Sequence, residues 1–346
     1  MTAPSPISWN TLPKVTLHEH IDGSLRPETL IELAAERGLV LPHSEPAAVA
    51  KWMLDNANSG NLVRYLEGFA FTVQAMATAE ACERVSYELA MDAEAEGCVL
   101  AEFRMAPQLF EPFGLNAESA TEAMLAGLKR SGLACGLIIC GMRHEPPTVT
   151  AEAARIAVRY QHQGVVGFDL AGPELGFPPN IHAQAIDIAL NAGLGLTLHA
   201  GEADVGSRVL EAAQLGATRI GHGVNVVRQD DGTLPSWVDQ ARARGLHFEV
   251  CPSSNVHTGA AISVAEHPIK AMLKAGLSLS CSTDNRLMSA TTLCEELTRL
   301  HTETGLSAEQ LIQMQVNGMR ASFLPQAQKD AALALLQAWR AGHAVA

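Results

Sequence analysis

The sequence predicts an α/β fold: a (β/α)8 barrel with a helical insertion after the first strand and extra helices near the C-terminal end. Short runs of β-forming residues recur eight times, and Ala-rich amphipathic segments separate them. The length of 346 residues matches one large barrel domain. Strands that alternate with helices pair in parallel, and eight such units make a closed barrel the economical solution. An open, doubly wound sheet is the alternative.

The eight expected strands are short, and several are almost wholly apolar, as strands covered on both faces should be. They are 15–20, 98–105, 134–140, 164–170, 194–199, 218–221, 246–250 and 277–282. The expected helices between them include 80–96, 117–131, 151–163, 180–192 and 207–216. Segment 306–341 is predicted to form terminal helices outside the barrel. Because no low-complexity linker interrupts the pattern, we expect residues 1–346 to form a single domain.

The connection between the first two strands is unusually long. Residues 21–97 separate them, whereas a simple crossover needs far fewer. Within this insertion four apolar residues at i, i+3, i+4 and i+7 share one helix face. They are Leu62, Tyr65, Leu66 and Phe69. An insertion after a barrel strand lies at the C-terminal face, where active sites form. The stripe fits an apolar lid over a pocket, although its periodicity alone favours an ordinary core-facing helix.

Charge and composition exclude several classes of function. The net charge of −13 argues against partners held by phosphate neutralisation, and therefore against nucleic acid and anionic membrane. The N-terminal segment lacks the features of a signal peptide, and no run of about 18 apolar residues occurs. Seven cysteines without C-x-x-C spacing fit free thiols in a reducing compartment. We expect a cytoplasmic monomer or homodimer with a small-molecule substrate.

Metal-ligating side chains gather where the expected strands end. His18 and His20 close the first strand, and at i and i+2 their imidazoles project to the same face. Strands five, six and eight end at His199, His222 and Asp284. In a parallel barrel all these ends meet at one rim. Three imidazoles and one carboxylate suit a divalent cation such as zinc, with a position left for water. The candidate ligands are His18, His20, His199 and Asp284.

Two more side chains at this rim are candidates for proton transfer. A bound divalent cation lowers the pKa of its water from about 15.7 toward about 7. His222 lies outside the ligand set, so it is free to act as a base or to orient that water. Glu202, three residues beyond His199, is placed to orient a ligand or to act as an acid–base group. The structural alternative for Glu202 is a carboxylate at a helix N-terminus, favoured by the dipole.

The ordered motifs resemble those of the adenosine deaminase family within the amidohydrolase superfamily. They are HEHIDGSLRPETL at 18–30, DLAGPE at 169–174, HAGE at 199–202, RIGHGV at 219–224, CPSSN at 251–255, STDN at 282–285 and SFLP at 322–325. The resemblance implies a (β/α)8 barrel with one catalytic zinc per chain. It also implies a hydrolase of purine metabolism that converts adenosine or 2′-deoxyadenosine to the corresponding inosine and ammonia.

The resemblance assigns roles to the residues that carry it. The four candidate ligands would hold the zinc. Glu202 would protonate N1 of the purine, which draws electron density from C6. His222 would hold the attacking water and stabilise the developing charge, and Asp284 would share the proton.

The remaining implied roles concern the substrate. The backbone amide of Gly172 would bond N3 of the purine, Asp22 would bind the ribose 5′-hydroxyl, and His20 would lie beside the substrate. The family also places an apolar helix over its site, which favours the lid interpretation of residues 62–69. Much of the family has a second Asp where this chain has Asn285. In the family, the residue at this position is expected to contact N7 of the purine, which is a hydrogen-bond acceptor. An Asn amide can donate a hydrogen bond to N7, whereas an ionised carboxylate cannot donate.

Several alternatives remain beside this reading. A binuclear amidohydrolase would need a Lys at the end of strand four, where 168–172 has none, and nucleic-acid deaminases need a C-x-x-C that the chain lacks. AMP is a disfavoured substrate, because no cluster of basic residues that could bind its phosphate lies near the motifs. Related adenine deaminases tend to carry Glu in place of Asp22. A deaminase of adenine or of a 5′-modified nucleoside such as aminodeoxyfutalosine stays open. The non-enzyme alternative is a catalytically dead homologue that binds metal or purine.

Overall fold

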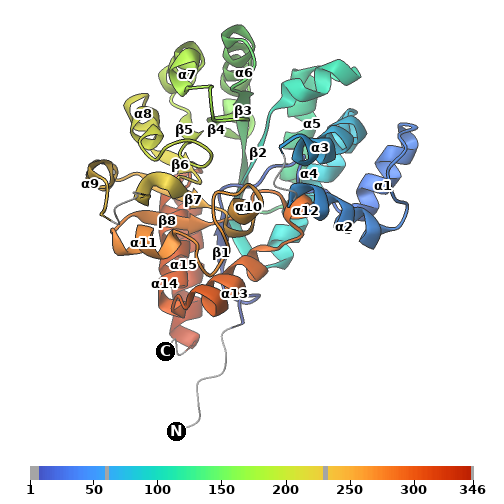
Figure 1. Ribbon diagram of the computed structural model, residues 1–346. Coiled ribbons are helices and arrows are strands. Elements are labelled where there is room, and N and C mark those ends of the chain that lie inside the picture. Colours follow the sequence, from blue (N-terminus) through green and yellow to red (C-terminus); the bar gives the residue numbers. More distant parts are fainter. Residues whose placement is uncertain (1–7, 59–61, 229–232, 344–346) are drawn as a thin grey trace.

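The computed structural model describes residues 8–58, 62–228 and 233–343. Within these ranges, eight strands form one parallel sheet in sequence order, so each strand pairs with its neighbours in the chain (Figure 1). The strands are β1 (Lys14–Thr16), β2 (Cys98–Met105), β3 (Cys135–Met142), β4 (Val165–Ala171), β5 (Gly195–His199), β6 (Arg219–Gly221), β7 (His247–Val250) and β8 (Ser278–Cys281). All eight expected strands are confirmed, but β1 ends at Thr16 rather than at residue 20.

The barrel closes just beyond the ends of β1 and β8. The backbone N–H of Asp284 donates to the carbonyl of His18 at 3.0 Å, and the N–H of His20 donates to the carbonyl of Asp284 at 2.7 Å. The hydroxyl oxygen of Ser282 accepts from the N–H groups of Leu17 and His18, each at 3.2 Å. The last and first strands therefore meet, which rules out the open sheet. His18 and His20 still lie side by side, but on the extended segment after β1.

Helices surround the barrel (Figure 1). The insertion between β1 and β2 holds α1 (Pro27–Glu36), α2 (Pro46–Ala57), α3 (Leu62–Met76) and α4 (Ala79–Ala95). The following connections hold η1 (Pro107–Phe113), α5 (Ala117–Ser131), α6 (Pro147–Arg159), η2 (Gln161–Gln163), η3 (Pro179–His182), α7 (Ala183–Asn191), α8 (Arg208–Gln214), η4 (Val224–Val227), α9 (Ser236–Ala243), α10 (Pro252–His257) and α11 (Ile269–Lys274). After β8 come α12 (Arg286–Ser289), α13 (Leu293–Thr304), α14 (Ala308–Ala321) and α15 (Gln326–Gly342).

The C-terminal helices begin at clear sequence signals and pack outside the barrel, as expected. Helix α14 starts at a capping box, in which the Ser307 hydroxyl accepts from the N–H of Gln310 and the Gln310 side chain returns to the N–H of Ser307. A Cβ on Gly318 would lie 2.8 Å from Val15 and 3.0 Å from Ser280. The absence of a side chain there lets α14 approach both β1 and β8, so it covers the seam where the barrel closes.

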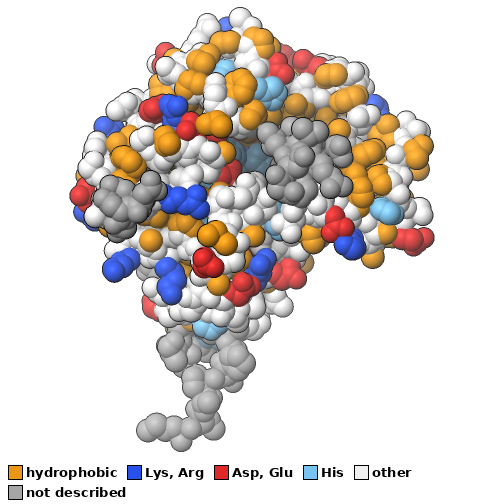
Figure 2. All heavy atoms as spheres, in the orientation of Figure 1, with side chains coloured by type: hydrophobic (Ala, Val, Ile, Leu, Met, Phe, Trp, Pro, Cys, Tyr) orange, Lys and Arg blue, Asp and Glu red, His pale blue; other side chains and the backbone are white. Residues whose placement is uncertain are grey.

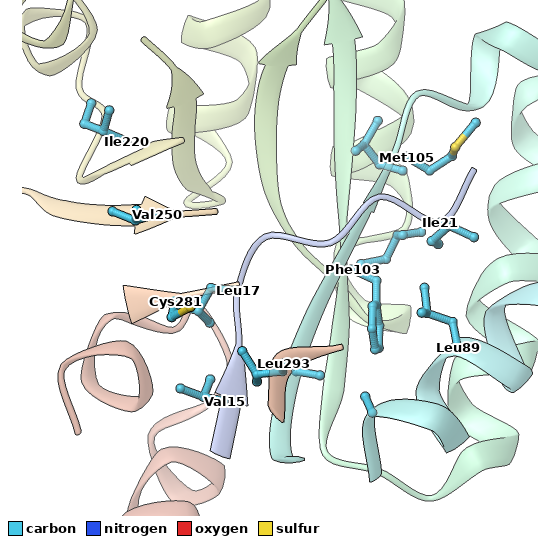
Figure 3. Close-up of a cluster of buried hydrophobic side chains, with 14 of the residues drawn as sticks. Val15, Leu17, Ile21, Leu89, Phe103, Met105, Ile220, Val250, Cys281 and Leu293 are labelled. Carbon is cyan, nitrogen blue, oxygen red and sulfur yellow. The ribbon is translucent and has the colours of Figure 1, made fainter. Parts of the chain in front are cut away.

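The strands divide their side chains between the helices and the barrel interior. Phe103 and Met105 of β2 face outward, and Phe103 packs against Leu89 of α4 (Figure 3). The alternate residue Glu102 accepts from Arg219 of β6 at 2.6 Å. Since β2 and β6 lie four strands apart, this ion pair crosses the barrel interior. The interior positions of these two strands therefore carry paired charges, whereas several of the other strands are almost wholly apolar.

No helix in the described ranges is both long and apolar enough to cross a membrane.

Candidate active site

Three histidines and one aspartate from distant parts of the chain meet at the C-terminal rim of the barrel. Asp284 Oδ1 lies 3.4 Å from Nε2 of His18 and 3.4 Å from Nε2 of His20. The His18 ring is 4.6 Å from that of His199, centre to centre, and 5.3 Å from that of His20. The structure thus brings together all four residues that the sequence nominated as metal ligands. Figure 2 shows histidine and acidic side chains at the floor of a hollow in this face.

Two residues at the rim adopt the left-handed backbone conformation that side chains other than glycine seldom take. They are His222 with φ 59° and Asp284 with φ 63°. The neighbour of His222, Gly221, has room for no side chain, because a Cβ there would lie 3.0 Å from Cε1 of His18. Such a conformation persists only where surrounding contacts enforce it, and it concentrates at functional sites. Here it turns both side chains into the space between the histidines.

Buried carboxylates orient two of the histidines from behind. Glu249 Oε2 lies 2.9 Å from Nδ1 of His18, and Asp169 Oδ2 lies 2.9 Å from Nδ1 of His199. A carboxylate accepts hydrogen bonds, so each Nδ1 carries the hydrogen and each Nε2 presents its lone pair to the rim. This arrangement prepares both imidazoles to ligate a cation through Nε2.

Two buried arginines neutralise these carboxylates. Arg104 lies 2.7 Å from Asp169 and 2.6 Å from Glu249, and Arg219 lies 2.6 Å from Glu249. Burial by itself would raise the pKa of Glu249, but the two guanidinium groups hold it well below its ordinary value. Sequence reasoning missed Asp169 and Glu249 as parts of the site. Each is a charged residue inside an otherwise apolar strand. A buried charge needs a partner, so this pattern could have indicated their role.

The donor set fits a divalent cation. His18 Nε2 is buried and forms no hydrogen bond with any residue in the described ranges. Burial lowers the pKa of His18 to about 4, so the imidazole is neutral near pH 7. The ligand atoms of His18, His20 and Asp284 all lie within 4.8 Å of one another, as do those of His18, His199 and His222. A neutral lone pair aimed at other imidazoles and a carboxylate is what a borderline cation binds.

Glu202 and His222 lie next to each other beside this cluster. Glu202 Oε2 is 3.6 Å from His222 Nε2. Its other oxygen, Oε1, accepts from the Thr258 hydroxyl at 2.9 Å and from the Asn255 amide at 3.1 Å. Helix α8 begins only at Arg208. The alternative of a helix N-terminal carboxylate is therefore wrong. Glu202 Oε1 is held by two hydrogen bonds, and Oε2 faces His222.

The loop that carries Glu202 is clamped from both sides. Glu174 accepts hydrogen bonds from the four backbone N–H groups of residues 201–204, three of them at 2.8 to 3.1 Å. From the opposite side, the Asn225 amide donates to the carbonyls of Glu202 at 2.7 Å and Asp204 at 2.9 Å. Neither residue is among the predicted site residues, although Glu174 ends the motif DLAGPE and Asn225 directly follows RIGHGV. The clamp sets the position of Glu202 without touching its carboxyl group.

Three of the candidate substrate-binding residues, Asp22, Gly172 and Asn285, lie at or near the ends of strands at this rim. Asp22 is buried, and its Oδ1 has no hydrogen-bond partner within the described ranges. Burial raises the pKa of Asp22 to about 7. Gly172 follows β4 with φ 89°, a conformation that glycine adopts without strain. Asn285 is buried beside Gly23, where a Cβ would lie only 1.8 Å from Asn285 Oδ1. The motif therefore requires glycine at position 23.

The expected lid helix exists as α3, but its proposed stripe is only partly visible. The side chains of Leu62, Tyr65 and Leu66 lie outside the described residues. Phe69 is half-buried and packs against the hydrophobic core. A Cβ on Gly68 would lie 3.1 Å from the sulfur of Met288 in α12, the helix that follows Asn285. Helix α3 therefore reaches the rim, and its role as a lid stays a prediction.

We expect Asp169→Asn to weaken metal binding by about 10- to 100-fold, because the amide no longer secures the orientation and basicity of the His199 ring. Competition with a chelator of known affinity measures this change. Asp239→Asn is the matched control, since Arg242 is the only ion-pair partner of Asp239 within the described ranges and the pair lies at the surface. Equal metal affinity in the two variants would contradict the role of Asp169.

The fold and the site together define a metal-dependent hydrolase built on a (β/α)8 barrel. The model of the adenosine deaminase family matches residues 13–339. The chain therefore belongs to the adenosine deaminase family, and it is a deaminase. Its relatives include the adenosine deaminase of Mycobacterium ulcerans, 38% identical over 329 residues and 90% of each chain. The adenosine deaminase of Mycobacteroides abscessus is 40% identical over 336 residues and 92% of each chain.

Solved structures agree in fold. The adenine deaminase from Arthrobacter aurescens superposes with a TM-score of 0.86 at 25% identity, covering 95% of this chain and 99% of that one. A zinc-bound amidohydrolase from Burkholderia ambifaria gives a TM-score of 0.85 at 23% identity, covering 98% and 94%. At this low identity the second likeness supports the barrel architecture alone.

Proposed function

We propose that the chain is a zinc-dependent aminohydrolase that converts adenosine and 2′-deoxyadenosine to inosine and 2′-deoxyinosine with release of ammonia. The observation that carries the proposal is the placement of Glu202 and His222 directly beside a cluster of three imidazoles and a carboxylate. The curated relatives at 38 to 40% identity bear the name adenosine deaminase, which supports this substrate class.

The proposed zinc ligands are His18, His20, His199 and Asp284. When bound, zinc would lower the pKa of a water molecule so that it becomes a nucleophile near neutral pH. The Ser254 hydroxyl donates to Asp284 Oδ2 at 2.5 Å, which leaves Oδ1 directed at the histidines. The chain therefore holds the two oxygens of Asp284 in different roles, one anchored and one available to a cation.

Glu202 is the proposed general acid. Protonation of N1 would make C6 of the purine more electrophilic, and Glu202 has a forward-facing Oε2 for this transfer. Its Oε1 is tethered by Thr258 and Asn255, so the side chain needs little reorganisation during the reaction. His222, with Nε2 facing Glu202 Oε2 at 3.6 Å, would contact the attacking water and the charge that develops at C6.

The proposed contacts to the nucleoside use the other rim residues. Asp22 has a buried oxygen without a partner in the described structure, which suits a ribose 5′-hydroxyl. The backbone amide of Gly172 would bond N3, and the Asn285 amide would donate to N7. Helix α3 would cover the bound purine. These assignments make the sugar part of what the site recognises.

The decisive experiment compares 6-aminopurines on zinc-loaded protein. We expect turnover of adenosine and 2′-deoxyadenosine, seen both as a fall in adenosine absorbance and as ammonia release. Protein stripped with a chelator and then reloaded with zinc is the matched control. Turnover of adenine alone would favour the adenine deaminase alternative, which the Arthrobacter aurescens neighbour raises. Turnover of 5′-substituted adenosines alone would place the substrate among modified nucleosides, and no turnover would overturn the proposal.

Gly23→Ala is expected to raise KM for adenosine about tenfold, the loss of roughly one hydrogen bond, with zinc content unchanged. The added methyl group would lie 1.8 Å from Asn285 Oδ1, so that side chain must move. Steady-state kinetics and metal analysis measure the two quantities. Gly342→Ala is the control, because no atom of the described residues would lie within 4 Å of a Cβ there. An unchanged KM would show that the position of Asn285 does not matter for binding.

A further inference from the structure

A chain of hydrogen bonds runs behind His222 and ends at a backbone amide. The N–H of Ile269 donates to Nδ1 of His267 at 3.0 Å. His267 Nε2 lies 3.2 Å from Asn255 Oδ1, and Asn255 Nδ2 lies 3.0 Å from His222 Nδ1. His267, Asn255 and His222 are all buried. Water therefore has little access to substitute for any partner in the chain.

The donor and acceptor of every hydrogen bond in this series can be assigned by starting from the backbone N–H of Ile269. A backbone N–H can only donate, so His267 Nδ1 must be the acceptor. Burial lowers the pKa of His267 to about 4, which keeps the ring neutral and places its one hydrogen on Nε2. That N–H donates to Asn255 Oδ1, and the Asn255 NH2 group is thereby turned toward His222. His222 Nδ1 consequently accepts from Asn255, which leaves Nε2 as the nitrogen that carries the hydrogen.

The other neighbour of Asn255 agrees with this orientation. Asn255 Nδ2 also lies 3.1 Å from Glu202 Oε1. Oε1 also accepts from the Thr258 hydroxyl, so it serves as an acceptor here, which requires the NH2 group of Asn255 and excludes the rotated amide. Two independent partners, His267 on one side and Glu202 on the other, thus assign the same orientation to Asn255.

We propose that Asn255 and His267 are positioning residues that hold His222 as the tautomer with hydrogen on Nε2. This inference deepens the proposed deaminase function and rests on it for its chemical meaning. His18 and His199 have the opposite tautomer, because carboxylates face their Nδ1 atoms. Three of the four histidines at this rim thus differ in the group that contacts Nδ1, which is a carboxylate for His18 and His199 and an amide for His222. A carboxylate at Nδ1 leaves Nε2 with a lone pair for a cation. An amide NH2 group at Nδ1 leaves Nε2 with a hydrogen to donate.

This tautomer is consistent with the omission of His222 from the proposed ligands, although a ring nitrogen of His222 lies within 4.8 Å of ring nitrogens of His18 and His199. Its Nδ1 is occupied by Asn255, and its Nε2 bears a hydrogen that faces Glu202 Oε2. A nitrogen that already bears a hydrogen has no lone pair for a cation or for a proton of water. His222 therefore acts as a donor to the reacting oxygen, and the exchange of protons falls to Glu202 and Asp284.

Nitrogen-15 NMR of zinc-loaded protein labelled at histidine tests the proposal directly, with His222→Gln used to assign the resonance. We expect His222 Nδ1 at the position of an unprotonated ring nitrogen and Nε2 at that of a protonated one. In Asn255→Asp an acceptor oxygen faces Nδ1, so the hydrogen should move to Nδ1 and kcat should fall about tenfold or more. A protonated Nδ1 in the wild-type protein would overturn the proposal.

His267 supplies a matched pair of variants that leaves Asn255 in place. His267→Gln retains a donor toward Asn255 Oδ1 and is expected to keep the wild-type tautomer and most of kcat. His267→Leu removes that donor and is expected to lose the single tautomer. Identical His222 spectra in both variants would contradict the relay. A correct tautomer in a protein that does not turn over adenosine would overturn the proposed function alone, whereas turnover with hydrogen on Nδ1 would overturn only the relay.

Discussion

Glu202→Gln is expected to keep its zinc and to lose turnover by a factor of about 10² to 10⁴, the usual contribution of a positioned general acid. The amide matches the carboxyl group in size and can still accept from Thr258 through its oxygen. It has no acidic proton to give to N1 of the purine. Metal analysis and steady-state kinetics on adenosine measure the two effects separately.

Glu211→Gln is the matched control for this variant. Glu211 lies on α8, and its one ion-pair partner among the residues that the structure describes is Arg208 at the surface. Its replacement should therefore leave kcat and zinc content at wild-type values. A Glu202→Gln protein with the wild-type rate would make Glu202 a structural residue. Loss of zinc from that protein would instead show that Glu202 supports the metal cluster.

Arg104→Met is expected to lower the free energy of unfolding by about 3 to 5 kcal/mol, the usual cost of breaking a buried ion pair from one side. Arg104 is fully buried and contacts Asp169, Glu249 and the carbonyl of Leu17. Without the guanidinium group, the buried carboxylates of Asp169 and Glu249 lose a positively charged partner. Urea unfolding of the metal-free protein measures the change without a contribution from metal binding.

Arg26→Met provides the comparison at the surface. Arg26 forms a bidentate pair with Asp92, but its side chain is 43% exposed. Solvent screens such a pair, so its loss should cost no more than about 1 kcal/mol. Equal destabilisation by the two variants would show that the interior network contributes no more than a surface contact.

The positions of the strands could be predicted because they depend on local pattern. Each strand is a short β-forming run followed by glycine or polar residues, and β2 was expected at 98–105 and found there. The one clear error concerns β1, which was extended to residue 20 although it ends at Thr16. Residues 18–20 remain extended because they bond to Asp284 and Arg104. Those partners are distant in sequence, so no local pattern reveals them.

The strand ends also identified the residues at the rim. His18, His199, His222 and Asp284 were selected from their place after β-forming runs, and parallel strands deliver such ends to one edge. Sequence reasoning did not find the residues behind them. Glu249 bonds His18 across 231 positions, and Asn255 bonds His222 across 33. Interpreted alone, Glu249 is an acid within a strand and Asn255 a polar residue in the motif CPSSN.

The alternation that makes the barrel, and the reactive side chains at its strand ends, can be predicted from local pattern. How these side chains are held depends on partners that only the folded chain brings close. Arg104 and Arg219 keep the interior carboxylates charged, Glu174 clamps the loop of Glu202, and Asn255 orients His222. The physical reason is that periodicity is a property of neighbouring residues, whereas hydrogen-bond direction depends on which distant group lies opposite.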